Sequence, residues 1–262
     1  MKKRVITAVV ALMIFIPLLI LGGIWLDITA FVLGMIALSE ILIMKKQILV
    51  SIEAIISLIG TLFVIAPVGW YQNVPTLIRN PFFALYIFIV LLLLSTVFTD
   101  NRFSFDDAGV ISLGMMYIGM GFHYFLAARA ENWTIIMYAL LIVWCTDSGA
   151  YIFGKKFGKH KLSPVSPNKT WEGSIGGTVL AVIVCTIWLM FFPNHIYNNL
   201  IMFFITILLS ITGQFGDLIE SAIKRYYGVK DSGKILPGHG GILDRFDSLL
   251  LVLPVLHLVG II

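Results

Sequence analysis

Residues 174–192 read SIGGTVLAVIVCTIWLMFF, an apolar run without a charged side chain that is long enough to cross a bilayer as a helix. Similar runs recur along the whole chain of 262 residues, which is 59% hydrophobic and only 12% charged, with a mean hydropathy of +0.98. Soluble domains carry about 25% charged residues. The composition therefore predicts an all-α, polytopic integral membrane protein and excludes a soluble enzyme of this length.

About nine membrane spans are expected from these runs. At ~20 residues each, they use about 180 residues and leave little for a soluble domain. We therefore expect one membrane domain, 1–262, with a scaffold half at 1–130 and a catalytic half at 131–262 that carries polar segments at 154–173 and 217–247. The expected spans cover roughly 5–23, 24–44, 48–70, 82–98, 109–127, 133–153, 174–192, 200–217 and 248–262.

The positions of lysine and arginine predict the orientation, because these residues gather on the cytoplasmic side of membrane proteins. With the N-terminus in the cytoplasm, all but two of the 18 Lys and Arg residues lie inside, and only Arg79 and Arg129 lie outside. Both polar segments then face the cytoplasm. We expect a multi-pass protein of a bacterial-type cytoplasmic (inner) membrane.

The most polar stretch is residues 221–247, SAIKRYYGVKDSGKILPGHGGILDRFD. Charged groups are costly beside a bilayer unless they serve a function, and cations next to carboxylates and glycines are typical of a phosphate and divalent-metal site. Gly240 and Gly241 would let backbone amides approach a phosphate. His239 beside them is a metal ligand, a phosphate donor or only a polar loop residue, and the sequence leaves these alternatives open.

Carboxylates just before this stretch and at its end are candidate metal ligands. If the helix of the expected span 200–217 continues beyond residue 217, Asp217, Ser221 and Lys224 lie on one face of it. Asp244 and Asp247 would share a helix face in the same way, and with Asp217 they could hold one or two Mg²⁺ ions. The simpler alternatives are helix capping by the two aspartates and an intrahelical pair between Lys224 and Glu220.

Asp147 lies inside a predicted span, about two turns from its cytoplasmic end, where a charged residue is by default a functional candidate. Small neighbours would let another helix or a ligand come close, and the alternative is an aspartate that only holds helices together. In the segment 161–173, Lys161, Ser163 and Lys169 could contact a triphosphate or anionic lipid head groups.

Two early glutamates, Glu40 and Glu53, lie near the ends of expected spans, and the sequence does not assign them a role. Cys145 and Cys185 fall inside expected spans and are interpreted as small buried hydrophobic residues rather than as a disulfide or metal site.

The 27-residue pattern that begins at Ser221 resembles the signature of the phosphatidate cytidylyltransferases, also called CDP-diacylglycerol synthases. It reads Ser221-x-Ile223-Lys224-Arg225-x4-Lys230-Asp231-x-Gly233-x2-Leu236-Pro237-x-His239-Gly240-Gly241-Ile242-x-Asp244-Arg245-Phe246-Asp247. The patterns around Asp147, residues 161–173 and residues 213–221 are also similar to this family. The resemblance covers residues of about 144 to 250 closely and the first half only in its hydrophobic layout.

This resemblance implies an enzyme that couples CTP to phosphatidate, giving CDP-diacylglycerol and pyrophosphate for phospholipid biosynthesis. It implies Mg²⁺ held by Asp217 and Asp244, with a second cation as an open alternative. We interpret Asp217, Asp244, Asp247 and Lys224 as catalytic. The residues interpreted as substrate-binding are Ser221, Arg225, Lys230, Asp231, His239, Gly240, Gly241, Arg245, Lys161, Ser163, Lys169 and Asp147.

Two other functions remain open at this point: a CTP-dependent transferase that acts on another lipid, and a cation-coupled transporter with Asp147 and Asp217 as intramembrane ion sites. A transporter predicts an inverted repeat, which the sequence does not show. The expected partners are CTP, phosphatidate and membrane lipids, without nucleic acid, and a homodimer stays open. The sequence does not decide acyl-chain preference, CTP over dCTP, or the number of metal ions.

Overall fold

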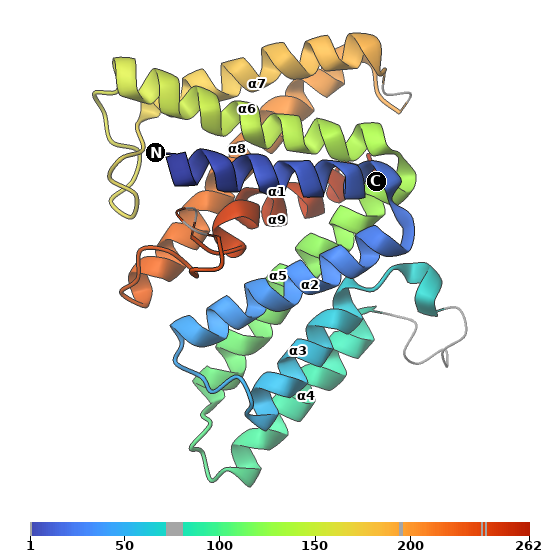
Figure 1. The fold of residues 1–262 in the computed structure, drawn as a ribbon, viewed down its shortest axis with the longest axis vertical. Helices are drawn as coiled ribbons and strands as arrows, with labels where there is room; N and C mark the ends of the chain where they lie inside the picture. The colour runs from blue at the N-terminus through green and yellow to red at the C-terminus, as the bar shows by residue number, and fades with distance from the viewer. Residues whose placement is uncertain (1, 72–80, 194–195, 237, 239) are drawn as a thin grey trace. The chain divides into compact units, whose positions relative to one another are not determined.

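The computed structural model describes residues 2–71, 81–193, 196–236, 238 and 240–262 (Figure 1). Within these residues the chain forms α-helices, one 3-10 helix (Val68–Tyr71) and no extended strand, which confirms the all-α prediction. The nine α-helices of the described residues are α1 (Lys2–Leu21), α2 (Gly23–Met44), α3 (Ile52–Ile65), α4 (Pro81–Phe98), α5 (Phe105–Glu131), α6 (Trp133–Phe157), α7 (Trp171–Phe191), α8 (Asn199–Tyr226) and α9 (Leu243–Leu258).

Five of these helices, α2, α5, α6, α7 and α8, are long and apolar enough to cross a membrane. The segments Val9–Leu21, Ile52–Ile65 and Phe83–Phe98 are apolar but shorter. At 14 residues, α3 reaches about 21 Å, less than the ~30 Å hydrocarbon core. A polytopic membrane protein is therefore confirmed, whereas the number of spans and the side on which the N-terminus lies remain predictions.

The chain divides into two compact units. The first contains residues Met1–Ala130 and Val229–Asp244, and the second contains Glu131–Gly228 and Arg245–Ile262. The segment 229–244, which belongs to the polar signature, is therefore grouped with the helices of the N-terminal half. The interpretation of the two halves as scaffold and catalytic parts stays a prediction.

In the first unit, glycines and apolar side chains join α2, α3, α4 and α5. A Cβ on Gly34 of α2 would lie 2.3 Å from Ile65 Cδ1 of α3, and one on Gly60 of α3 would lie 2.5 Å from Met115 Cε of α5. Helix α1 is tied to α5 by Arg129, whose Nε donates a hydrogen bond to the backbone oxygen of Leu19 at 2.6 Å. The glycines leave room for the side chains of the neighbouring helix, which lets the helices pack closely.

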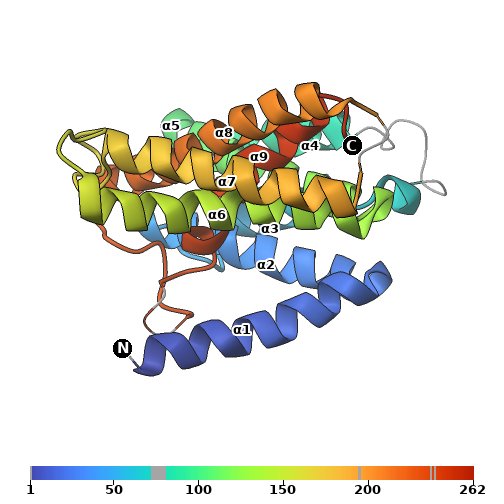
Figure 2. The same ribbon diagram turned by 90° about the horizontal axis from the view of Figure 1, so that it is seen from above.

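In the second unit, α6, α7 and α8 run side by side (Figure 2). A Cβ on Gly149 of α6 would lie 2.8 Å from the Cα of Gly177 of α7, and a Cβ on Gly177 would lie 2.4 Å from the backbone oxygen of Thr146. The two helices therefore touch through backbone atoms. This confirms that the small residues beside Asp147 admit a neighbouring helix.

Several helices extend beyond the spans expected from hydropathy, and α8 and α9 carry candidate site residues in the extension. Helix α8 continues past 217 to Tyr226, with Lys224 and Arg225 in its last turn, where cations favour the helix dipole. It ends before Gly228, whose φ of 68° suits a glycine C-cap. Helix α9 begins at Leu243, so Asp244 and Asp247 are helical. The helical continuation assumed for both groups is confirmed.

Candidate active site

Three carboxylates gather where α8 meets α9 in the second unit. Asp217 and Glu220 come from α8 and Asp247 from α9, and each offers an oxygen that lies within 4.8 Å of the others. Glu220 is only 1% exposed. Carboxylates this close repel one another, and an oxygen-binding divalent cation removes that repulsion. The donor set therefore fits a metal ion.

Gly216 explains why α9 can approach α8 at this point. A Cβ at Gly216 would lie 2.7 Å from the backbone oxygen of Asp247 and 2.9 Å from the Cα of Ser248. Side chains three apart on a helix share a face, so Asp217 and Glu220 both lie beside this contact. The backbone approach at Gly216 thus brings the carboxylate of Asp247 to the two from α8.

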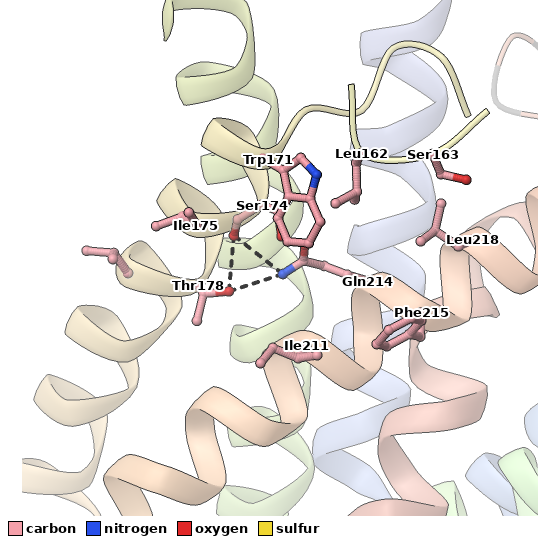
Figure 3. Close-up of a pocket in the computed structure, with 11 residues that line it drawn as sticks. Leu162, Ser163, Trp171, Ser174, Ile175, Thr178, Ile211, Gln214, Phe215 and Leu218 are labelled. Atoms are coloured by element: carbon pink, nitrogen blue, oxygen red, sulfur yellow. Dashed lines mark hydrogen bonds between the residues drawn. The ribbon is translucent and has the colours of Figure 1, made fainter. Parts of the chain in front are cut away.

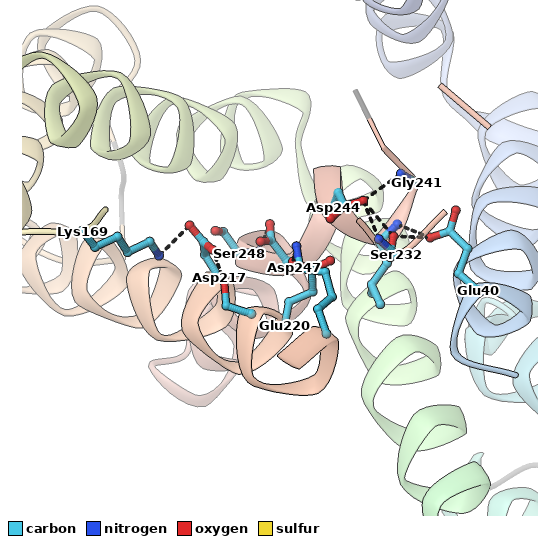
Figure 4. A network of polar contacts seen from close by, with 12 residues as sticks. Glu40, Lys169, Asp217, Glu220, Ser232, Gly241, Asp244, Asp247 and Ser248 are labelled. Atoms are coloured by element: carbon cyan, nitrogen blue, oxygen red, sulfur yellow. Dashed lines mark hydrogen bonds and ion pairs between the residues drawn. The ribbon is translucent and has the colours of Figure 1, made fainter. Parts of the chain in front are cut away.

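Two lysines offset part of the negative charge of the cluster, and Figure 4 shows one of them, Lys169, pointing toward Asp217. Lys169 Nζ, from the loop before α7, lies 2.5 Å from Asp217 Oδ2. Lys224 forms an ion pair with Glu220, which confirms the intrahelical pair weighed as an alternative. Ser221 Oγ donates a hydrogen bond to Asp217 Oδ1 at 3.3 Å, so these two side chains do share a face. The cluster therefore combines both polar segments.

Asp147 of α6 belongs to the same site. It interacts electrostatically with Asp217, Lys169 and Arg245. Asp247 in turn interacts with both Asp217 and Asp147. The sequence singled out Asp147 as a charge inside a span and as a substrate-binding candidate, and the structure brings it close to the carboxylate cluster.

A second network of carboxylates lies in the first unit, between α2 and the segment 229–244 (Figure 4). Asp244 Oδ2 accepts hydrogen bonds from the amide of Ser232 at 2.9 Å and from the amide of Gly241 at 2.8 Å. Glu40 Oε1 accepts from the amide of Ile242 at 2.8 Å, and Oε2 accepts from that of Leu243 at 2.9 Å. The signature segment is thus held by one carboxylate of its own and one from α2.

The signature glycines make room for these carboxylates. Gly240 has a φ of 82°, which side chains rarely adopt, and a Cβ there would lie 2.3 Å from Asp244 Oδ2. A Cβ at Gly241 would lie 2.3 Å from Glu40 Oε2. Their contact with a phosphate stays a prediction, but neither position accepts a side chain without moving a carboxylate.

The remaining candidates lie at the surface or outside the described residues. The side chains of Lys161, Arg225, Lys230 and Asp231 are exposed, and their roles in substrate binding remain predictions. His239 lies outside the described residues. Asp244 belongs to the first unit and Asp217 to the second, so a metal site shared by both also stays a prediction.

A mainly apolar pocket of about 570 Å³ lies between α7 and α8 in the second unit (Figure 3). Ser163 is one of its lining residues, as are Phe215, two residues before Asp217, and Leu218, which follows Asp217 in the sequence. Its polar side is formed by Gln214, whose Nε2 donates to Thr178 Oγ1 at 3.1 Å. Part of this mainly apolar lining comes from α8, the helix that carries Asp217.

Sequence reasoning left two site residues without a functional role. Glu220 was explained by its pair with Lys224, and that pair hides its place in the cluster. Glu40 was left open. Its signal in the sequence was a lone acidic residue in the otherwise apolar stretch 28–44, a position where a charge needs a partner.

Comparison with known proteins extends the resemblance to the whole chain. Residues 2–262 match the model of the Cytidylyltransferase family. The chain is 48% identical to the phosphatidate cytidylyltransferase of Staphylococcus haemolyticus and 48% identical to that of Staphylococcus epidermidis, with 98% of each chain covered. It is 47% identical to the phosphatidate cytidylyltransferase of Staphylococcus aureus over 98% of both chains. The chain therefore belongs to the cytidylyltransferase family.

Proposed function

We propose that this protein transfers the cytidylyl group of CTP to phosphatidate, giving CDP-diacylglycerol and pyrophosphate for phospholipid biosynthesis. Relatives named phosphatidate cytidylyltransferase align with 98% of the chain. The observation that carries the proposal is the ion pair between Lys169 and Asp217 beside the carboxylate cluster. This ion pair joins a lysine of the segment 154–173 to a carboxylate of the segment 217–247. Both segments are attached to apolar helices, which suit an enzyme that acts on a lipid.

The reaction joins two polyanions. An oxygen of the phosphatidate phosphate forms a bond to the α-phosphorus of CTP while the bond from that phosphorus to pyrophosphate breaks. The attacking oxygen is already an anion, so no protein base is required, and the chain must mainly align the phosphates and neutralise their charge. Lys169 and Lys224 lie at the cluster and are the first candidates for this role. Further predicted phosphate ligands are Ser221, Arg225, Lys230 and Arg245.

We propose Mg²⁺ as the cofactor. Asp217, Glu220 and Asp247 would hold it by geometry, and Asp244 is retained as a further ligand because the family signature implies it. When bound, Mg²⁺ supplies a Lewis acid that stabilises charge on phosphoryl oxygens and on the departing pyrophosphate. Asp147 would orient Lys169 or, as the alternative, bind a second cation. We further propose a cytoplasmic membrane location with the site facing the cytoplasm, where CTP is available.

The test uses two labelled forms of CTP with the purified protein, phosphatidate and Mg²⁺. Label at the α-phosphate should enter the lipid extract, and label at the γ-phosphate should leave as pyrophosphate. The reverse result, γ-label in the lipid, would identify a CTP-dependent kinase. Omitting phosphatidate or Mg²⁺ should stop the transfer. No transfer to any phospholipid acceptor would contradict the proposal and leave a transporter as the alternative.

A further inference from the structure

We propose that Glu40 is a positioning residue that fixes the signature segment 229–244 and, through Ser232, the orientation of the Asp244 carboxylate. As far as catalysis is concerned, this inference rests on the proposed function. Glu40 comes from α2, far from the signature in sequence, and lies outside the stretch in which the family resemblance is close. Its role is visible only once the chain is folded.

The contacts of Glu40 reach both ends of the segment. Its carboxylate is 1% exposed. Ser232 Oγ donates to Oε2 at 2.7 Å, near the start of the segment. The amides of Ile242 and Leu243, at its end, donate to Oε1 at 2.8 Å and to Oε2 at 2.9 Å. One side chain therefore closes the segment into a loop.

Glu40 also caps α9. The first amides of a helix have no partner within the helix, and an anion at this end is favourable because of the helix dipole. Ile242 and Leu243 have apolar side chains, so they cannot cap the helix themselves. A carboxylate from α2 takes their amides instead. Buried amides that lose such an acceptor are left unsatisfied, which destabilises the start of the helix.

Ser232 connects Glu40 to Asp244. Its hydroxyl lies 2.7 Å from Glu40 Oε2 and 3.0 Å from Asp244 Oδ2, and it is buried. A hydroxyl has one hydrogen, and the shorter distance to Glu40 Oε2 favours donation to Glu40, which holds the Ser232 side chain between the two carboxylates. The amide of Ser232 then donates to Asp244 Oδ2 at 2.9 Å. Such outer partners of a carboxylate ligand commonly affect metal affinity or activity by about 10- to 100-fold.

The segment is shaped around the Glu40 side chain. A Cβ on Gly233 would lie 2.5 Å from Glu40 Oε1, and one on Gly241 would lie 2.3 Å from Oε2. The backbone therefore approaches the carboxylate from two sides. Both glycines belong to the signature, and their lack of a side chain is explained by contact with a residue outside it.

The main test is Glu40→Gln, which keeps the shape of the side chain but turns one acceptor oxygen into a donor amide. We expect kcat for cytidylyl transfer to fall about 10- to 100-fold and the Mg²⁺ concentration for half activation to rise. Hydrogen exchange of peptides from 229–236 and 240–244 should become faster, while that of α3 and α4 is unchanged. Glu40→Asp, which restores the charge, should recover part of both.

The matched control is Glu53→Gln, which alters another buried carboxylate of the same unit. It should leave exchange of the signature segment and the Mg²⁺ dependence at their wild-type values. Ser232→Ala tests the connection. If Glu40 acts through Ser232, the double variant should lose less activity than the product of the two single losses.

Two outcomes would overturn the proposal. One is unchanged exchange of the signature segment in Glu40→Gln. The other is a lower melting temperature with wild-type kcat and Mg²⁺ dependence for the folded enzyme, which would make Glu40 structural only. Exchange does not depend on turnover. An inactive wild-type protein would therefore count against the proposed function alone, and the exchange data would still decide whether Glu40 orders the segment.

Discussion

The two groups of carboxylates differ in what surrounds them. Asp217, Glu220 and Asp247 lie against one another, with lysine side chains as their described counter-charges. Glu40 and Asp244 are surrounded by amides and a hydroxyl that donate to them (Figure 4). In the first arrangement three carboxylates repel one another at short range, and in the second the carboxylate oxygens accept hydrogen bonds from neutral donors. The first group therefore suits metal binding and catalysis, and the second group suits holding the segment 229–244 in one conformation.

The largest effect is expected for Asp217→Asn, which removes a charge from the first group. We expect cytidylyl transfer to be abolished, because Asp217 is both a cluster member and the partner of Lys169. The melting temperature in detergent should stay close to wild type, since one repulsive charge is lost together with one ion pair. The measurement is α-labelled CTP incorporation into lipid at saturating Mg²⁺.

The control for this variant is Asp100→Asn, the same change at an exposed turn residue with a φ of 51°, which asparagine adopts readily. It should have wild-type activity. Near-normal turnover of Asp217→Asn would contradict the proposed metal site on α8.

Asp244→Asn is expected to abolish activity as well. Hydrogen exchange distinguishes the two carboxylate groups, because only Asp244→Asn should make exchange in the segment 229–244 faster.

A smaller effect is expected for Gly216→Ala, which disturbs the first group without changing its charges. The added Cβ would lie 2.7 Å from the backbone oxygen of Asp247, so α9 must move away from α8. We expect an activity loss of about 10- to 100-fold, comparable to the loss of a supporting contact at a metal site, and destabilisation of about 1–3 kcal/mol. Both activity and melting temperature should be measured.

Gly109→Ala is the matched control, because a Cβ at this position of α5 meets nothing within 4 Å. Alanine is favoured over glycine within a helix by roughly 0.5–1 kcal/mol, so this variant should be as stable as the wild type or more stable. If Gly216→Ala had full activity, the close approach of α8 and α9 would not be needed for the cluster.

A still smaller effect is expected for Lys169→Met, which keeps the length of the side chain and removes its charge. Lys169 is the cation brought to Asp217 by the other polar segment. We expect kcat/KM for CTP to fall about tenfold, equivalent to about 1.4 kcal/mol. Lys155→Met, at an exposed lysine over the ring of Tyr151, should change it less than twofold. Equal effects of the two changes on kcat/KM would contradict a specific role for Lys169, which would then contribute only to the general positive charge of this surface.

The fold and two members of the first group, Asp217 and Asp247, could be predicted from the sequence, because their signals are local. Apolar runs gave the helices, and the spacing of Asp217, Ser221 and Lys224 gave one face of α8, as the contact of Ser221 with Asp217 confirms. Hydropathy ended α8 too early and began α9 too late. Polar residues at helix ends lower the hydropathy of a window without breaking the helix.

The second group could not be predicted, because its signal is not local. Glu40 and Ser232 are far apart in the chain, and nothing in the residues around Glu40 indicates that it accepts the amides of Ile242 and Leu243. Glu220 was missed for a different reason. Its pair with Lys224 accounted for its charge within one helix, so nothing pointed to Asp247 on the next one.

The smallest effect on activity is expected for Thr178→Val, in the hydrogen-bonded ladder that joins α6, α7 and α8 next to the first group. Thr178 Oγ1 accepts from Ser210 and from Gln214, each at 3.1 Å, and Ser210 also contacts Thr146 Oγ1 at 2.8 Å. Interhelical hydrogen bonds inside membrane proteins contribute only about 0.6 kcal/mol on average. Valine keeps the volume, so the melting temperature should fall slightly while transfer stays within about twofold of wild type. A loss of activity as large as that of Lys169→Met would show that the ladder takes part in catalysis and that the polar site extends further along α8 than the charged residues.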